Sequence, residues 1–336
     1  IEKNNENEIK FAKFIADFCE VKKLKHFERD AVIETLKYSI KLASEKNKIS
    51  ARFNKITEII YESNALSDEN QDFIKVKDVQ KAIQKKRIRN SKIEDRMNEM
   101  YRDGSYLIDV DGKKVGQING LAVMQVGESV FGKPSRITAS SYKGRYGILN
   151  IEREVAHSGS IHDKGVLILN GYIGNRYAKE DIPAMTTSIT FEQNYSGIDG
   201  DSASSTELYV IISSIAEIPI NQGIAVTGSM SQKGEIQPIG GVNEKIEGYY
   251  DVCRIKGLTG KQGVIIPIQN VKNLMLRDDI IKSVEEGQFH IYAISNVEEG
   301  LQILTGLTIA KIDEKVKAAF KKFSENCDEK KSEKGE

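Results

Sequence analysis

The chain has 336 residues, 39% of them hydrophobic and 29% charged, a composition typical of a folded domain with a hydrophobic core. Lys plus Arg and Asp plus Glu number 49 each, so net charge gives no argument for nucleic acid or a membrane as partner. Three distant cysteines and four scattered histidines argue against a disulfide framework or a metal site, and they fit a reducing compartment.

Residues 1–90 are predicted to form a small helical domain, because apolar residues recur there at helical spacing. The expected helices cover residues 9–18, 28–46, 50–60 and a segment that begins near residue 78. Ser50 is expected to N-cap the third helix. A short extended piece at 73–76 precedes the fourth. Residues 91–104, in which acidic and basic side chains alternate, are expected to be a connecting helix.

Residues 105–310 are predicted to form an α+β (mixed α/β) domain, because short Val-, Ile- and Thr-rich runs alternate there with helical patterns. Strands are expected at 106–110, 117–127, 135–141, 164–172, 186–194, 224–230, 234–239, 264–267 and 290–294. Helices are expected at 148–156, 203–215, 244–256, from about 270, and at 297–304. Residues 311–336 are expected to hold a C-terminal helix and a polar tail that is disordered beyond Glu325.

Residues 195–205 (YSGIDGDSASS) connect the strand at 186–194 to the helix at 203–215. Ser202 therefore stands at a glycine-bearing turn before a helix N-terminus, where unpaired backbone N–H groups can stabilise an oxyanion. This placement makes Ser202 a candidate nucleophile. Asp201 or Ser202 can equally be a plain N-cap, which is the more common role of such residues.

A serine nucleophile needs a base, and Lys245 is the best candidate. It lies in the first turn of the helix expected at 244–256, which Asn243 is expected to cap. The helix dipole and burial both lower a lysine pKa from about 10.4 toward roughly 7–8, where a neutral amine can accept a proton. Thr227, on an intervening strand, can hold the amine by a hydrogen bond. By position alone, Lys245 can also be an exposed surface residue.

Histidine is the more common base in serine hydrolases. His157 and His162 precede Ser202, and His290 opens an expected strand instead of lying in a loop. The GDSAS segment resembles a G-x-S-x-G nucleophile elbow without its last glycine, and in that hydrolase class the histidine follows the serine. A Ser–His arrangement therefore stays open as an alternative to Lys245.

Several segments resemble the Lon proteases and occur in the order seen in that family. They are YSGIDGDSAS at 195–204, VTGSM at 226–230, PIGGVNEK at 238–245 and VIIP at 264–267. Upstream, GQINGLAV at 116–123 and SGSIHDKGV at 158–166 look like the B-type branch. The resemblance covers about residues 105–306, and it implies a Ser–Lys dyad endopeptidase on the Lon proteolytic-domain fold.

Carried over to this chain, the resemblance implies that Ser202 is the nucleophile and Lys245 the general base. Thr227 matches a position that supports the lysine. Asp199 matches an acidic position that can pair with the lysine when the site is closed. The backbone N–H groups of Asp201 and Ser202 would hold the oxyanion, and peptide hydrolysis itself would need no cofactor or metal.

Residues 1–90 resemble the small helical lid of the AAA+ ATPase module of the same branch, and Arg52 falls where that family has a nucleotide-sensing arginine. No G-x-x-x-x-G-K-S/T loop occurs, so we expect that this chain does not hydrolyse ATP by itself. We expect this chain to be a fragment of a longer protein. The site for ATP and Mg²⁺ is expected to lie mostly in a part that precedes Ile1.

The resemblance further implies a homo-oligomer, a hexameric ring, that degrades unfolded or damaged proteins in the cytoplasm. A membrane anchor in the part before Ile1 is left open, and no nucleic-acid partner is inferred. Two alternatives remain. One is a non-proteolytic module with the same fold. The other is a latent fragment in which Asp199 holds Lys245 until the ring assembles.

Overall fold

The computed structural model describes residues 1–179 and 184–332, with side chains described up to residue 324. The chain divides into two compact units. The N-terminal unit comprises residues 1–96 together with 126–129 and 272–275, and the C-terminal unit comprises residues 97–125, 130–271 and the chain from 276 onward.

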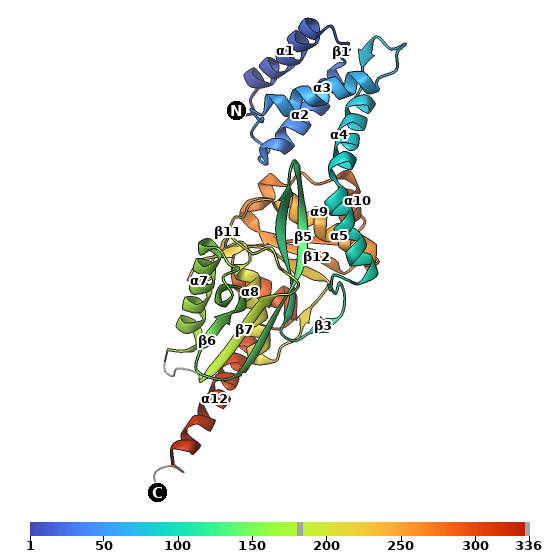
Figure 1. Ribbon diagram of the computed structural model, residues 1–336. Helices are drawn as coiled ribbons and strands as arrows, with labels where there is room; N and C mark the ends of the chain where they lie inside the picture. Colours follow the sequence, from blue (N-terminus) through green and yellow to red (C-terminus); the bar gives the residue numbers. More distant parts are fainter. Residues whose placement is uncertain (180–183, 333–336) are drawn as a thin grey trace. The chain divides into compact units, whose positions relative to one another are not determined.

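The N-terminal unit is helical, as the sequence predicts (Figure 1). Its elements are α1 (Asn5–Lys22), β1 (His26–Phe27), α2 (Arg29–Ala43), α3 (Phe53–Leu66), β2 (Phe73–Ile74) and α4 (Val76–Asn90). Apolar side chains of α1 and α3 form one core, in which Phe11, Ile15, Ile56 and Ile60 are buried. The connecting helix α5 spans Lys92–Asp103.

One predicted cap in this unit is wrong. Arg52, not Ser50, occupies the N-cap position of α3, and no side chain caps that helix. The hydroxyl of Ser50 instead accepts a hydrogen bond from the Arg52 backbone N–H at 3.2 Å, which forms a local turn ahead of the helix. A serine hydroxyl can accept a backbone hydrogen bond in a helix cap and in a turn. The residue type alone therefore could not distinguish the two arrangements.

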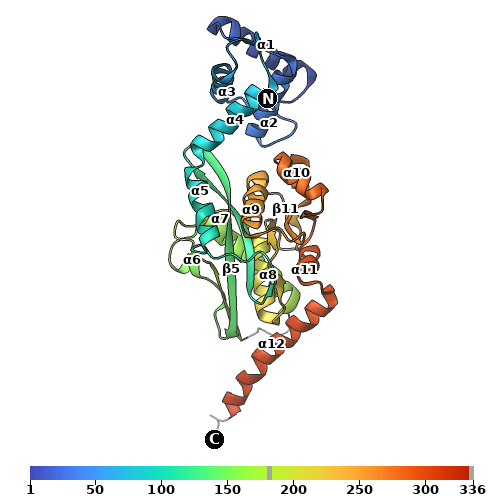
Figure 2. The same cartoon turned by 90° about the vertical axis from the view of Figure 1, so that its right-hand side faces the viewer.

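A seven-stranded mixed sheet organises the C-terminal unit (Figures 1 and 2). Its order is β13 (Phe289–Ile294), β12 (Gln262–Pro267), β9 (Ile224–Val226), β4 (Gln117–Val126), β5 (Ser129–Lys143), β7 (Met185–Phe191) and β6 (Gly147–Asn150). Neighbouring strands among β13, β12, β9 and β4 run parallel to one another. The strands β5 and β7 run antiparallel to each other. Two short pairs join β3 (Lys113–Lys114) to β8 (Ile220–Asn221) and β10 (Ser229–Met230) to β11 (Ile236–Gln237).

Helices cover this sheet, so the predicted α+β class is confirmed. They are α6 (Ile151–Glu154), α7 (Ser160–Tyr177), α8 (Ser204–Ala216), α9 (Val242–Lys256), η1 (Ile268–Asn273), α10 (Asp278–Glu285), α11 (Val297–Thr305) and α12 (Ile309–Ser332). Among residues 1–179 and 184–332, no helix has both the length and the apolar character needed to cross a membrane.

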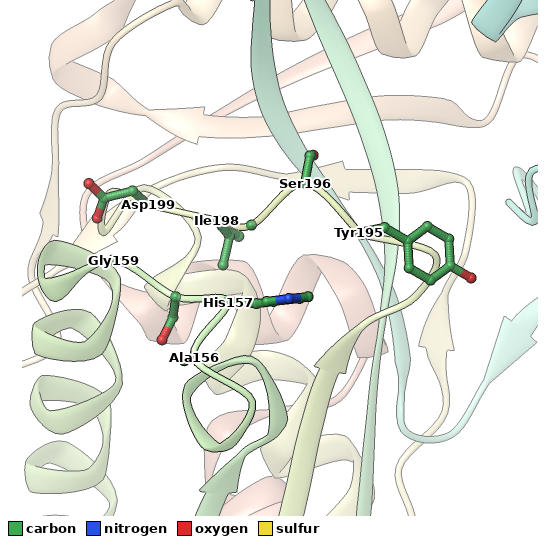
Figure 3. Close-up of a pocket in the computed structure, with 9 residues that line it drawn as sticks. Ala156, His157, Gly159, Tyr195, Ser196, Ile198 and Asp199 are labelled. Atoms are coloured by element: carbon green, nitrogen blue, oxygen red, sulfur yellow. The ribbon is translucent and has the colours of Figure 1, made fainter.

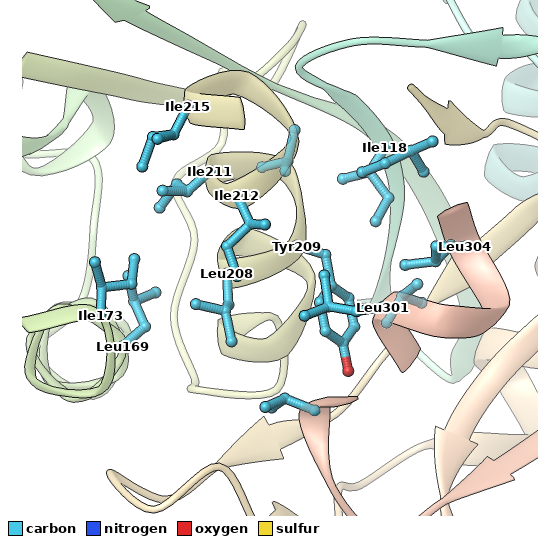
Figure 4. Close-up of a cluster of buried hydrophobic side chains, with 14 of the residues drawn as sticks. Ile118, Leu169, Ile173, Leu208, Tyr209, Ile211, Ile212, Ile215, Leu301 and Leu304 are labelled. Atoms are coloured by element: carbon cyan, nitrogen blue, oxygen red, sulfur yellow. The ribbon is translucent and has the colours of Figure 1, made fainter. Parts of the chain in front are cut away.

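The helix α8 is the centre of the core, because every residue in it except Ser214 is buried. Figure 4 shows Leu208 and Ile212 of α8 between side chains of α7 on one side and Leu301 and Leu304 of α11 on the other. Burying each such side chain stabilises the fold by about 1.5–3 kcal/mol. Because α8 begins two residues after Ser202, this packing also fixes the position of the candidate nucleophile.

The helix α9 packs on β12. Ile265 of β12 joins the core around α8, and strand alternation directs its buried neighbours Val264 and Ile266 to the opposite face. The hydroxyl of Tyr249 on α9 bonds the Gln222 carbonyl at 3.2 Å, next to β9. Helices therefore cover both faces of the sheet.

Three predicted elements in this unit are wrong. The apolar run at 164–172 lies inside α7, because a short continuous apolar segment does not separate a strand from a buried helix. Residues 148–156 hold the end of β6 and then α6, which Asn150 caps. Residues 106–110 have no regular structure.

Other elements are shifted or divided relative to the prediction. The strand expected at 224–230 is interrupted between β9 and β10, and the strand at 234–239 shortens to β11. The helix expected from 270 is η1 followed by α10. At the C-terminus α12 continues to Ser332, because Glu and Lys favour helix, so the expectation of disorder from Glu325 is wrong up to that point. Residues 333–336 lie outside the described residues.

Candidate active site

Ser202 lies in a turn immediately before α8, in the place the sequence predicts. Gly200 has a φ of 88°, a conformation that favours glycine. The N-cap of α8 is Ala203, and no side chain caps the helix. The alternative in which Asp201 or Ser202 is a plain N-cap is therefore wrong, and the Ser202 hydroxyl is not occupied by capping.

Lys245, the fourth residue of α9, directs its amine at Ser202. Its Nζ lies 2.9 Å from the Ser202 Oγ and 3.0 Å from the Thr227 Oγ1. The lysine is 3% exposed, and burial lowers its pKa to about 8, while the nearby Asp201 carboxylate acts in the opposite direction. A substantial fraction of the amine is therefore neutral near pH 8, and it can accept a proton.

The start of α9 differs from the prediction in one respect. Gly241, with a φ of 66°, occupies the N-cap position instead of Asn243. Lys245 still lies in the first turn, where its backbone N–H bonds the Gly241 carbonyl at 3.0 Å. The positive end of the helix dipole therefore acts on the amine as the sequence predicts.

Thr227 connects the lysine to the backbone of the serine. It follows β9, where its backbone N–H bonds the Ile265 carbonyl at 3.1 Å. Its hydroxyl donates to the Ser202 carbonyl at 3.2 Å, so the same oxygen can only accept from the Lys245 amine. A neutral amine that donates to Thr227 keeps its lone pair for the Ser202 hydroxyl.

Buried hydroxyls in the first turn of α8 anchor this arrangement to residues 226–230. Ser205 Oγ donates to the Gly228 carbonyl at 2.7 Å, and Thr206 Oγ1 donates to the Val226 carbonyl at 3.2 Å. Ser204 Oγ accepts from the Met230 N–H at 3.1 Å. The serines and threonine after Ser202 therefore hold the strand segment that carries Thr227.

The strand β5 fixes the first turn of α9 through a glycine contact. A Cβ on Gly132 would lie 2.1 Å from the Glu244 carbonyl oxygen, and one on Gly248 would lie 2.5 Å from the Gly132 carbonyl oxygen. No side chain fits between these backbones, so both positions require glycine. This close approach places the backbone of Lys245, and the sequence analysis did not identify it.

The two acidic residues upstream of Ser202 have different surroundings. Asp201 Oδ2 accepts a hydrogen bond from Ser229 Oγ at 2.8 Å. Asp199 lines a pocket of about 570 Å³ between residues 156–159 and 195–199 (Figure 3). A Cβ on Gly159 would lie 2.3 Å from the Asp199 carboxyl carbon. Among the described residues, the Lys245 amine makes its hydrogen bonds to Ser202 and Thr227 and shares neither a hydrogen bond nor an ion pair with Asp199.

In the part of the chain that the structure describes, no histidine makes a hydrogen bond to Ser202. His157 is exposed, and His290 Nε2 lies 2.9 Å from the Gly260 carbonyl oxygen. His162 is buried, and its Nε2 lies 3.0 Å from Asn150 Nδ2. The geometry therefore does not support the Ser–His alternative.

Arg52 is exposed at the start of α3, and among the described residues its guanidinium makes no hydrogen bond or ion pair. The charge is therefore accessible to an anionic group. Within residues 1–179 and 184–332, no group of three or more His, Cys, Asp or Glu side chains is arranged to hold a metal ion.

Comparisons with known proteins place both parts of the chain in the same family. A family model for the archaeal LonB AAA+ ATPase LID domain matches residues 26–89, and one for the Lon protease (S16) C-terminal proteolytic domain matches residues 87–306. A Lon protease homolog of Escherichia coli is 42% identical over 227 residues, which is 67% of this chain and 39% of that protein.

Archaeal relatives match a longer part of the chain. The archaeal Lon protease of Archaeoglobus fulgidus is 30% identical over 305 residues, or 88% of this chain and 45% of that protein. The archaeal Lon protease of Thermococcus kodakarensis is 30% identical over 316 residues, or 89% of this chain and 45% of that protein. The chain thus spans less than half the length of these curated relatives.

Proposed function

The chain belongs to the Lon protease family, and we propose that it carries a Ser–Lys dyad endopeptidase with Ser202 as nucleophile and Lys245 as general base. The observation that supports this most directly is the 2.9 Å distance between the buried Lys245 Nζ and the Ser202 Oγ. A nucleophile and a base within hydrogen-bond reach, with the base held by a third group, form the expected arrangement for acyl transfer.

In the first half of the reaction, Ser202 Oγ attacks the peptide carbonyl carbon while the neutral Lys245 amine takes the hydroxyl proton. The tetrahedral intermediate collapses when the carbon–nitrogen bond breaks and the Lys245 ammonium gives its proton to the leaving amine. The products are an acyl-serine ester and a peptide with a free N-terminus.

The second half repeats these steps with water. Neutral Lys245 takes a proton from water as the hydroxide attacks the ester carbonyl, and the ammonium then returns a proton to Ser202 Oγ. The burial of Lys245 supports this role twice, because it keeps part of the amine neutral near pH 8 and holds the amine in one position.

Backbone N–H groups before α8 are the proposed oxyanion donors. Among the described residues, the N–H groups of Asp201 and Ser202 have no acceptor within hydrogen-bond distance. Donors of this kind act on the oxygen that becomes negative in the transition state, and removing one costs about 10²–10³-fold in kcat.

The activities of the longer protein are also proposals. We propose that unfolded or damaged proteins are the substrates and that the chains assemble as a hexameric ring. Residues outside this chain would bind most of the ATP and Mg²⁺. Within this chain, the exposed guanidinium of Arg52 would contact a phosphate group of the nucleotide. The lid match at residues 26–89 supports this assignment.

Cleavage of casein and of a fluorogenic peptide by wild type, Ser202→Ala and Lys245→Ala tests the proposal, with oligomeric mass recorded on each sample. We expect both variants to lose cleavage while they keep the wild-type mass. Full cleavage by either variant would exclude the dyad. A wild type without cleavage in every oligomeric state would favour the non-proteolytic alternative.

A further inference from the structure

The pocket between residues 156–159 and 195–199 has walls that the backbone holds together. The Gly159 N–H donates to the Ile198 carbonyl at 2.8 Å, and the Ile198 N–H donates to the His157 carbonyl at 2.9 Å. These bonds form a short parallel bridge between the two segments. The pocket volume of about 570 Å³ lies within the range of ligand-binding sites. The pocket is therefore formed before any ligand arrives.

The pocket lies close to the candidate nucleophile along the chain. Asp199 lines it and precedes Ser202 by three residues, a separation that spans at most about 11 Å even in a fully extended chain. The turn at Gly200, which has a φ of 88°, makes the actual span shorter. A substrate whose scissile carbonyl lies at Ser202 can therefore place the side chain of a nearby residue in this pocket.

The Asp199 carboxylate is available to a ligand. Among the residues whose side chains the structure describes, it makes no hydrogen bond or ion pair, either with His157 of the opposite wall or with any other group. Two neighbouring acids differ from it in this respect. Asp201 accepts a hydrogen bond from Ser229 at 2.8 Å, and Asp163 accepts one from the wall residue Ser158 at 2.6 Å.

The start of α7 holds this carboxylate in position. Gly159 is the N-cap of α7, and no side chain caps the helix. A Cβ on Gly159 would lie 2.3 Å from both the carboxyl carbon and the Oδ1 of Asp199, so the acid occupies the space that a capping side chain would fill. The positive end of the helix dipole favours a negative charge at this place.

The rest of the pocket suits a long side chain with a charged end. Figure 3 shows Asp199 at one end of the pocket and Tyr195 at the other. Tyr195 is 83% exposed, and its ring can pack along an aliphatic stem or face a cation. The small residues Ala156, Gly159 and Gly197 line the space between the two ends.

We propose that this pocket binds a lysine or arginine side chain of the substrate polypeptide, close to the scissile bond, and that Asp199 is a specificity-determining residue. The inference rests on the proposed function and names a substrate class for that site. It assigns Asp199 a role in substrate selection, which is separate from any contact with Lys245.

The test uses pairs of fluorogenic peptides that differ only in lysine or norleucine, which has the stem of lysine without the amine. The substituted position is moved through three residues on each side of the scissile bond. For each pair we would measure the ratio of kcat/KM values in wild type, Asp199→Asn and Glu154→Gln. Both substrates of a pair meet the same protein, so a change in the Ser–Lys dyad cancels from the ratio. Glu154 is the matched control, because it is exposed close to residues 156–159 but does not line the pocket.

We expect wild type to prefer lysine at one position by about 5- to 20-fold, as for an ion pair that the bound substrate shields from water. Asp199→Asn should bring this ratio to within twofold of one, and Glu154→Gln should keep the wild-type ratio. The proposal would be overturned by a wild type that prefers lysine at no position. A preference that survives in Asp199→Asn, or that falls equally in Glu154→Gln, would also overturn it.

A second readout does not depend on turnover. The Kd of the preferred lysine peptide and of its norleucine counterpart would be measured by fluorescence anisotropy with Ser202→Ala and with the double variant Ser202→Ala, Asp199→Asn. We expect tighter binding of the lysine peptide to Ser202→Ala and equal binding of both peptides to the double variant. Equal Kd values with Ser202→Ala would overturn the inference. If wild type proved inactive in the cleavage assay, the proposed function would fail, whereas the Kd values for the six peptide pairs would still decide whether the pocket selects a basic side chain.

Discussion

Lys245 Nζ lies 3.0 Å from Thr227 Oγ1, and that hydroxyl donates its own proton to the Ser202 carbonyl. The threonine therefore orients the amine and the serine backbone with one oxygen. Thr227→Val keeps the shape and removes both hydrogen bonds, so we expect kcat/KM to fall by about tenfold or more, with about 1–2 kcal/mol of stability lost. Thr227→Ser, the matched control, keeps the hydroxyl and should remain within a few-fold of wild type. A valine variant with full activity would exclude this role.

The pH dependence of cleavage should follow the buried amine. Because burial lowers the pKa of Lys245 to about 8, the active neutral form increases as pH rises through that value. The nearby Asp201 carboxylate raises this pKa, so Asp201→Asn should shift the rise of kcat/KM to lower pH. The measurement is a pH–rate profile from pH 6 to 10 for both proteins. A shift toward higher pH in the variant would contradict the electrostatic account.

Glu207 should make the fold less stable at alkaline pH. Its folded pKa of about 8 lies above the unfolded value, so the contribution of the protonated carboxyl is present below about pH 4.5 and is lost as pH rises through 8. Glu207→Gln removes this titration. We expect the free energy of unfolding of the variant, relative to wild type, to increase between pH 5 and pH 9, by a few kcal/mol at most. A difference that is constant across this range would show that Glu207 is not a proton-linked group.

The glycine contact between β5 and α9 should be sensitive to a single methyl group. A Cβ on Gly248 would lie 2.5 Å from the Gly132 carbonyl oxygen, so Gly248→Ala must displace the first turns of α9. We expect a loss of about 1–3 kcal/mol and a fall in kcat, because the Lys245 amine moves from Ser202. Gly174→Ala is a useful control, since a Cβ there meets nothing within 4 Å. Equal melting temperatures and rates for both variants would contradict this packing argument.

Local sequence signals predicted much of the candidate site. Ser202 precedes a helix and Lys245 lies in a helix first turn, and each placement follows from a short pattern that the structure reproduces. Their 2.9 Å contact depends on the order of strands in the sheet, which local patterns do not contain. Its position in a helix first turn made Lys245 a candidate base but left it open as a surface residue, and the family resemblance then supported the pairing.

Other features could not be predicted because they depend on tertiary contacts. The run at 164–172 also carries apolar side chains off the buried face of α7, such as Leu167, which is 58% exposed, and this weakened the helical periodicity that would have identified it. His162 was considered only as a base. Its hydrogen bond to Asn150 depends on the packing of α7 against the end of β6. Gly132 carries no pattern that distinguishes it from a turn glycine.

The account depends most on Ser202 being a nucleophile that Lys245 activates. A fluorophosphonate probe, with the modified residue located by mass spectrometry, tests this without requiring turnover of a peptide. We predict that Ser202 of wild type is modified, at a rate that rises with pH through about 8. We predict that Lys245→Met, which keeps the length of the side chain without the amine, reduces this rate by about 10²-fold or more. Modification at another serine, or an unchanged rate in Lys245→Met, would contradict the dyad.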